Sequence, residues 1–130
     1  MNNAPTDKLN LDEIERVKQI VLANPKKIDM SHPRTTQISK RGKIIGRSCC
    51  VAGIVRTLHP ELDDDCTNGP TAIAQAFGCD LVSADTIFVA TFTDKLLSEI
   101  TAEEIAAVLD ELAKTGRVRR YDEKAEEVQA

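Results

Sequence analysis

The sequence predicts a mainly α-helical fold: a compact bundle of about five helices, with a basic β-hairpin or ordered loop between the first two. Aromatic residues make up 3% of the 130-residue chain and Trp is absent, so the core must be built from Ile, Leu, Val and Ala. Apolar residues recur at helical spacing in several segments, and capping residues, Pro and Gly mark the ends of those segments. The length is that of one ordinary domain.

The first helix is predicted over residues 11–23. Asn10 is a suitable N-cap, and Glu13 follows it three residues later, as in a capping box. The helix is expected to end at Asn24, because Pro25 disfavours the helical conformation of the residue before it. Its apolar face is formed by residues at helical spacing: Leu11, Ile14, Val17 and Val21.

Residues 25–47 show no helical period. Residues 35–39 and 43–45 are rich in Thr and Ile, which favour strands, and they flank Lys40-Arg41-Gly42. A Gly-containing connection between two such runs is typical of a hairpin. We therefore expect a short, exposed β-hairpin or an ordered loop that lies against the helices, because an isolated hairpin is marginally stable.

A second helix is predicted over about residues 49–58, with Ser48 as its cap and His59-Pro60 as its end. Its apolar stripe follows the spacing i, i+3, i+4, i+7: Val51, Ile54, Val55 and Leu58. Gly53 lies inside this helix, where Gly costs about 1 kcal/mol relative to Ala. We therefore expect a neighbouring helix to approach closely at Gly53.

An acidic connector over residues 61–65 leads to a third helix, predicted over about residues 70–77. Asn68-Gly69 forms a turn before this helix, Pro70 suits its first position, and Gly78 suits its end.

Two more helices complete the predicted bundle. A fourth helix is expected over about residues 84–91, capped by Ser83. A fifth is expected over residues 102–114, where Thr101 and Glu104 fit a capping box.

The predicted organisation is a disordered lead over residues 1–9, a single helical domain over 10–116 and a charged tail over 117–130. Within the tail, Val118 and Tyr121 are the residues suited to dock onto the bundle. No apolar run approaches the ~20 residues of a membrane span, and the first residues lack the order of a signal peptide. We expect a cytoplasmic protein with reduced thiols and no membrane partner.

Two short stretches resemble motifs of one family. Residues 25–30 read Pro-Lys-Lys-Ile-Asp-Met, and residues 45–53 read Ile-Gly-Arg-Ser-Cys-Cys-Val-Ala-Gly. They are similar to motifs of a family of small phage and bacterial proteins with a Cys-Gly-Thr-x-x-Cys-Ile-Ala-Gly pattern. In this chain, Ile45 stands at the position of the first Cys and Arg47 at the position of the Thr. The likeness spans about residues 14–116. It implies a compact helical fold in the cytoplasm of a bacterium, or of a host if the chain is phage-encoded, and no particular chemistry.

The cysteine and histidine residues do not form a recognisable reactive site. Structural zinc sites usually pair ligands at C-x₂₋₄-C spacing, which the chain lacks. A helix N-terminus would lower the pKa of the Cys49 or Cys50 thiol, but His59 lies about 14 Å along the same helix, which leaves His32 as the only histidine able to act as a base. We assign no catalytic residue, metal ligand or cofactor, and the sequence favours a protein that is not an enzyme. The residues considered were Cys49, Cys50, Cys66, Cys79, His32 and His59.

Charge is distributed unevenly along the chain. The window from Lys26 to Arg56 carries a net +7, which leaves −11 for the rest of a chain whose net charge is −4. Such a window is either a solvated loop that keeps an acidic protein soluble or a contact surface for an anion. The candidate binding residues are Arg34, Lys40, Arg41, Lys43 and Arg47.

The leading prediction is a non-enzymatic interaction protein that binds an acidic partner protein or a small anionic ligand through this basic window. If it is phage-encoded, its partner is a host factor. A nucleotide-binding protein, which sequesters or hydrolyses its ligand, is the first alternative. A nucleic-acid-binding or self-assembling structural protein is the second. The window has no aromatic residue on which a base would stack, which disfavours nucleic acid.

Overall fold

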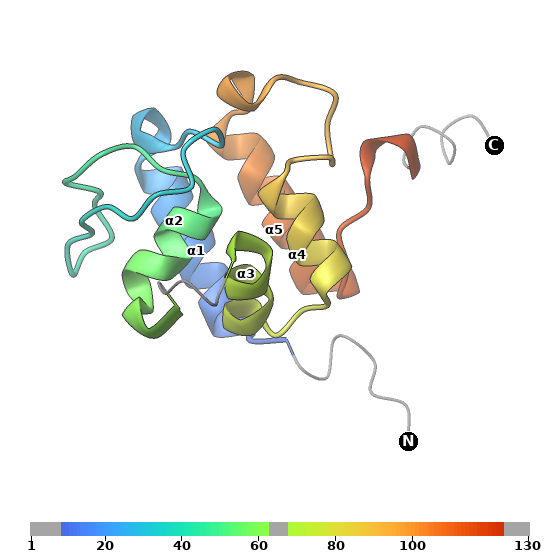
Figure 1. Cartoon of the computed structure of the whole chain (residues 1–130), viewed down its shortest axis with the longest axis horizontal. Helices are drawn as coiled ribbons and strands as arrows, with labels where there is room; N and C mark the ends of the chain where they lie inside the picture. The colour runs from blue at the N-terminus through green and yellow to red at the C-terminus, as the bar shows by residue number, and fades with distance from the viewer. Residues whose placement is uncertain (1–8, 63–67, 124–130) are drawn as a thin grey trace.

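The computed structural model describes residues 9–62 and 68–123, and these form a compact, mainly α-helical bundle. The predicted fold class is confirmed (Figure 1). The α-helices are α1 (Leu11–Ala23), α2 (Val51–Leu58), α3 (Gly69–Phe77), α4 (Leu81–Phe88) and α5 (Ala102–Thr115). Short 3₁₀ turns lie between them: η2 (Pro25–Lys27), η3 (Pro60–Leu62) and η4 (Leu97–Glu99).

The helices pack as two close pairs joined through α2. α1 lies along α5, α3 lies along α4, and α2 contacts α3 and α1. Residues 51–55 of α2 are all buried, so the first part of this short helix is enclosed by the bundle and the loop, whereas residues 56–58 are half-buried. The core is mainly aliphatic, with Phe77 and Phe92 as its buried aromatic residues among those described. Its largest fully buried aliphatic side chains include Ile14, Ile54, Ile73, Ile87, Ile105, Leu109 and Leu112.

Local signals at several helix ends act as the sequence predicts. The Asn10 side chain accepts a hydrogen bond from the Glu13 amide at 3.1 Å, and α1 spans the predicted residues. α5 begins with the full capping box of Thr101 and Glu104 and ends one residue beyond the predicted range. α3 ends at Gly78, whose φ of 67° is left-handed.

Two predicted caps are wrong. α4 begins at Leu81, three residues before the predicted start, because Asp80 supplies the cap; Ser83 is buried inside the helix instead. α2 begins at Val51 with Cys50 at its N-cap position and no side-chain cap. Ser48 is placed before that turn, where its carbonyl oxygen accepts a hydrogen bond from Arg34 Nε at 3.0 Å.

The basic segment between α1 and α2 is an ordered loop, and a β-hairpin is not formed. One antiparallel bridge pairs Ile38 with Ile44, and one parallel bridge pairs Ile28 with Cys49. Neither extends into a strand anywhere in the described residues. The ladder stops next to the turn because the Gly42 carbonyl and the Ile44 amide are hydrogen-bonded to the side chain of Asn24 and not to a second strand.

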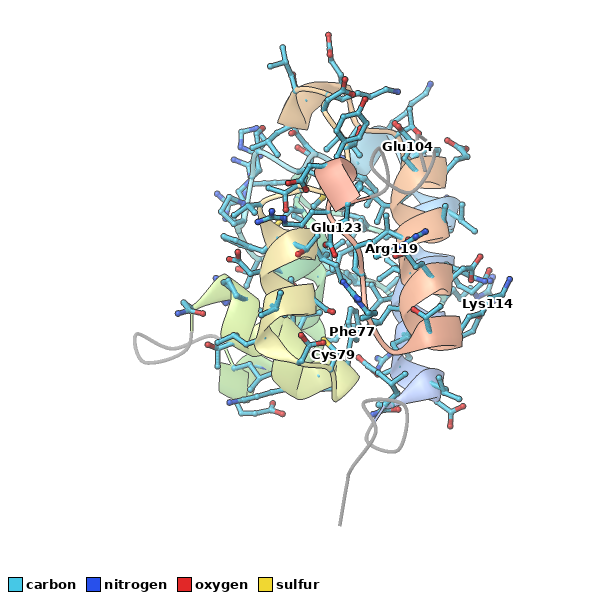
Figure 2. The ribbon with its side chains drawn as sticks, turned by 90° about the vertical axis from the view of Figure 1, so that its right-hand side faces the viewer. Phe77, Cys79, Glu104, Lys114, Arg119 and Glu123 are labelled. Carbon is cyan, nitrogen blue, oxygen red and sulfur yellow. The ribbon has the colours of Figure 1, made fainter. Side chains whose placement is uncertain are left out.

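The described part of the predicted tail packs against the bundle. Val118 is buried, and the Tyr121 amide donates a hydrogen bond to the Thr91 carbonyl at 2.7 Å. Figure 2 shows the segment that carries Arg119 running between α4 and α5. Residues 1–8 of the predicted lead, residues 63–65 of the acidic connector, Cys66 and residues 124–130 lie outside the described residues.

No helix in the described part of the chain is long and apolar enough to cross a bilayer.

Candidate functional site

The basic loop (residues 28–50) is fixed to the bundle by the buried side chain of Asn24. Its amide nitrogen donates hydrogen bonds of 2.7 Å to the carbonyls of Ile20 and Gly42, and its oxygen accepts one of 2.9 Å from the Ile44 amide. Gly42 has a φ of 82°, which favours Gly and turns the chain at this point. The tip of the loop is therefore held to the end of α1 by one polar side chain.

The entry of the loop lies directly on α2. A Cβ built on Gly53 would overlap the carbonyl oxygen of Arg34, so Gly53 is required for the loop backbone to approach. The prediction of close approach at Gly53 is confirmed, but the approaching element is the loop and not a neighbouring helix. Thr57 extends the contact, because its hydroxyl oxygen accepts a hydrogen bond from the Thr36 amide at 2.9 Å.

Three of the five predicted binding residues contact carbonyl groups of the protein itself. Arg34 donates to Ser48 O at 3.0 Å, Lys43 Nζ lies 3.5 Å from Ala23 O, and Arg47 lies 3.4 Å from Thr35 O. Arg34 is half-buried, which makes it part of the loop's internal structure. Lys43 and Arg47 remain exposed at the surface.

Lys40 and Arg41 differ from the other three. Both are exposed at the tip of the loop, and their side chains make no hydrogen bond or ion pair with the described residues. The one acidic residue of the loop, Asp29, does not face them, since it is hydrogen-bonded to Ser31 at the other end of the loop and lies 3.4 Å from His32. The Ser31 hydrogen bonds lower the pKa of Asp29 below its ordinary value.

Lys40 and Arg41 border a groove of about 600 Å³. We call it the basic groove; it lies between α1, the loop tip and the end of α2, and it is lined by Arg16, Gln19, Ile20, Ala23, residues 38–42, Thr57 and Leu58. Three cations thus lie around one hollow that also contains aliphatic side chains. The structure brings Lys40 and Arg41 together here, whereas Arg47 borders a separate, smaller hollow with residues 35–37 and Gly46.

Arg16 is a site residue that was not among the predicted binding residues, because it lies outside the basic window from Lys26 to Arg56. The signal is present in the helical spacing: residues 16, 19, 20 and 23 lie on one face of α1, and this face is the wall of the groove. What the sequence does not show is that the loop folds back to this face.

His59 also has a partner that the sequence does not predict. Its Nε2 lies 2.6 Å from the carboxylate of Glu13, a residue that is 7% exposed, and its Nδ1 lies 3.7 Å from Glu61. Glu13 in turn lies 3.5 Å from Arg16 at the groove. Both ring nitrogens of His59 face carboxylates, so this histidine links α1 to the end of α2 beside the groove.

The thiols of Cys49 and Cys50 are in the wrong environment for a nucleophile. Cys49 and Cys50 are completely buried, and burial raises the pKa of the Cys49 thiol to about 12 and that of Cys50 above its ordinary value. The lowered pKa expected from the helix N-terminus is therefore wrong, since desolvation outweighs the helix dipole. Within the described ranges, no three His, Cys, Asp or Glu side chains are grouped so that they could hold a metal ion.

Comparison of the chain with protein-family models, with curated proteins and with solved structures finds no match. The likeness of residues 25–30 and 45–53 to a phage and bacterial family stays a prediction. Function must accordingly be argued from the geometry of the site.

Proposed function

We propose that this chain is a binding protein, without catalytic chemistry of its own, that holds an acidic segment of a partner protein in the basic groove. The observation that carries the proposal is the convergence of Arg16, Lys40 and Arg41 on one groove from two separate elements. Long-range attraction from such a cluster accelerates encounter with an acidic partner and selects against basic ones.

The lining of the groove favours a peptide segment over a bare anion. Ile20, Ile38 and Leu58 supply apolar contact between the cations, and Gln19, Ser39 and Thr57 supply neutral hydrogen-bonding groups. A segment that carries both carboxylates and aliphatic side chains matches this mixture. If the chain is phage-encoded, which the family resemblance allows, the partner would be a host protein.

A nucleotide is the alternative ligand, because arginine and lysine side chains bind phosphates well. Among the described lining residues there is no aromatic side chain on which a base could stack. A bound nucleotide would leave the aliphatic lining of the groove without an apolar contact, so an acidic peptide with aliphatic side chains is the better match.

The experiment measures binding of a fluorescent probe peptide of alternating Glu and Leu, compared with a probe in which Gln replaces Glu. The double variant Lys40→Ala/Arg41→Ala should lower affinity for the Glu probe at least tenfold, which is about 1.4 kcal/mol. Both residues are exposed and free of internal partners, so folding should be unaffected. Raising the salt concentration should weaken binding of the wild type.

The single variant Lys40→Ala should also weaken binding, and Arg47→Ala is its matched control. Each removes one positive charge from the same exposed loop, but Arg47 borders a different hollow. The affinity of Arg47→Ala should stay close to that of the wild type. Equal loss in Arg47→Ala and in Lys40→Ala would show that overall charge, not the groove, drives binding. Tighter binding of inorganic tripolyphosphate or ATP than of the Glu probe would favour the nucleotide alternative.

A further inference from the structure

α4 lies on the opposite side of the molecule from the basic loop (Figure 1), and aliphatic residues of α4 and of its C-terminal end are exposed to solvent. Val82 is 71% exposed, Leu81 57% and Val89 42%, and Tyr121 nearby is 46% exposed. Single exposed aliphatic residues are ordinary, but a contiguous set on one helix face usually marks an interaction site. α4 is packed against α3 on its other side, so it holds a fixed position in the bundle.

The same face contains a hollow of about 460 Å³. It lies between α4 and the start of α3, and the exposed Leu81 and Val82 form part of its wall. The other lining residues are Asn68, Pro70, Asp85, Thr86, Thr91 and Arg120. A second, smaller hollow continues from Thr91 and Arg120 towards Tyr121. The recess therefore has an apolar, solvent-exposed wall on its α4 side.

Opposite charges border this recess. Asp85 lies on α4 and Arg120 on the segment that follows α5. Arg120 is paired with Asp122 at 2.8 Å, but its side chain remains 55% exposed and so can meet a further carboxylate. A recess with an apolar wall and both signs of charge on its border can be complementary to a copy of itself.

We propose that the α4 face is a homodimer interface, in which two copies of this chain meet about a two-fold axis. In such an interface each contact occurs twice, so Asp85 of one copy lies against Arg120 of the other and the reverse. Leu81 and Val82 of each copy pack against the apolar wall of the other copy's recess. A second copy is favoured over an unrelated partner because the apolar wall and the two opposite charges all border one recess.

The dimer presents its two basic loops at opposite ends, because each loop lies on the far side of its own bundle from α4 (Figure 1). This consequence rests on the proposed function, whereas the dimer itself does not. A partner with two acidic segments would then be bound through both grooves, with a gain in avidity.

The test is sedimentation equilibrium of the full chain across about 1–500 µM, a range chosen because small interfaces are weak. The mass should rise from 14.3 kDa towards twice that value. Val82→Glu should keep the mass at 14.3 kDa over the whole range, with an unchanged circular dichroism spectrum. Ile45→Glu is the control, since Ile45 is 66% exposed but lies in the basic loop, and it should dimerise like the wild type.

Charge exchange gives a second, independent readout. Asp85→Arg alone and Arg120→Asp alone should each weaken dimerisation at least tenfold, and the double variant should recover most of it. A wild type that stays at 14.3 kDa at every concentration would overturn the proposal. So would a dimer that Val82→Glu leaves intact, or single charge variants that the double variant does not rescue.

Discussion

The basic loop on one side of the bundle and residues 117–120 on the other are both non-helical segments, and each is hydrogen-bonded to one buried polar side chain. Asn24 makes two hydrogen bonds to the basic loop, whereas Ser83 makes one to the segment after α5. On the loop side, the backbone is fixed by these contacts and Lys40 and Arg41 are left exposed without partners in the described part of the chain.

On the α4 side, exposed arginines are paired with carboxylates and apolar groups are left exposed to solvent, which is the reverse of the basic loop. Arg117 pairs with Glu123 and Arg120 with Asp122, both at 2.8 Å, while the aliphatic residues of α4 remain exposed. The difference shows which groups each face offers to a partner: free cations on the basic loop, and apolar area on α4. Both faces depend on anchors inside the bundle, and these anchors can be tested by substitution.

The largest effect is expected for Gly53→Ala. The added Cβ overlaps the Arg34 carbonyl oxygen, which is backbone and cannot rotate away, so the basic loop must lift from α2. We expect a loss of about 3 kcal/mol or more in the free energy of unfolding, at the upper end for overpacking. Urea denaturation measures it. Ala107→Gly on the exposed face of α5 is the control, with a loss of about 1 kcal/mol from helix propensity.

Asn24→Ala should rank second. It leaves the Gly42 carbonyl and the Ile44 amide without their partner, and Asn24 itself is 6% exposed. A loss of about 2–3 kcal/mol is expected, together with faster amide exchange at Ile44. Asn24→Asp keeps the acceptor for the Ile44 amide but loses both donated bonds, so it should remain destabilised. Amide exchange at Ile44 as slow as in the wild type would show that Asn24 does not anchor the loop.

Ser83→Ala tests the anchor on the other side. Its hydroxyl oxygen accepts a hydrogen bond of 3.0 Å from the buried Val118 amide, which is left unpaired in the variant. Because one bond is lost and not two, we expect about 1–2 kcal/mol. Ser98→Ala, at an exposed position of η4, should change stability by less than about 0.5 kcal/mol. A loss at Ser83 as large as that at Asn24 would remove the distinction between the two sides.

These two anchors also show how far the sequence predicts this molecule. Asn10, Gly78 and Thr101 act within their own helices, so local patterns are sufficient to predict α1, the end of α3 and the start of α5. Asn24 and Ser83 act on segments 18–35 residues away in sequence, and no local pattern contains that information. Ser83 was therefore interpreted as a cap although it is an anchor.

The candidate site likewise has one property that the sequence predicts and one that it does not. Its charge can be predicted from composition, because the window from Lys26 to Arg56 is visibly basic. Which cations are available depends on the loop's path: Arg34 is directed to Ser48, while Arg16 joins from α1. The exposed face of α4 was obscured by its misplaced start, since a helix that begins at residue 84 excludes Leu81 and Val82.

The smallest effect is expected from the thiols on the two sides, Cys49 beneath the basic loop and Cys79 in the turn before α4. Burial raises the pKa of each to about 12 from an ordinary value of 9.0. The unfolded state therefore loses its thiol protons first as the pH rises, and it gains stability relative to the folded state. The stabilisation that comes from keeping these two thiols protonated should be fully present below about pH 9 and should be lost between about pH 9 and 12.

The fully buried Cys49 should account for about 1 kcal/mol of the loss between pH 8 and pH 10, at about 1.4 kcal/mol per pH unit above the unfolded pKa. Cys79 is partly exposed, so its share should be smaller. Urea denaturation of Cys49→Ala and Cys79→Ala at both pH values separates the two. Parallel pH dependence in wild type and Cys49→Ala would mean that the loop opens above Cys49 at alkaline pH, because only solvent access would let that thiol ionise in the folded protein.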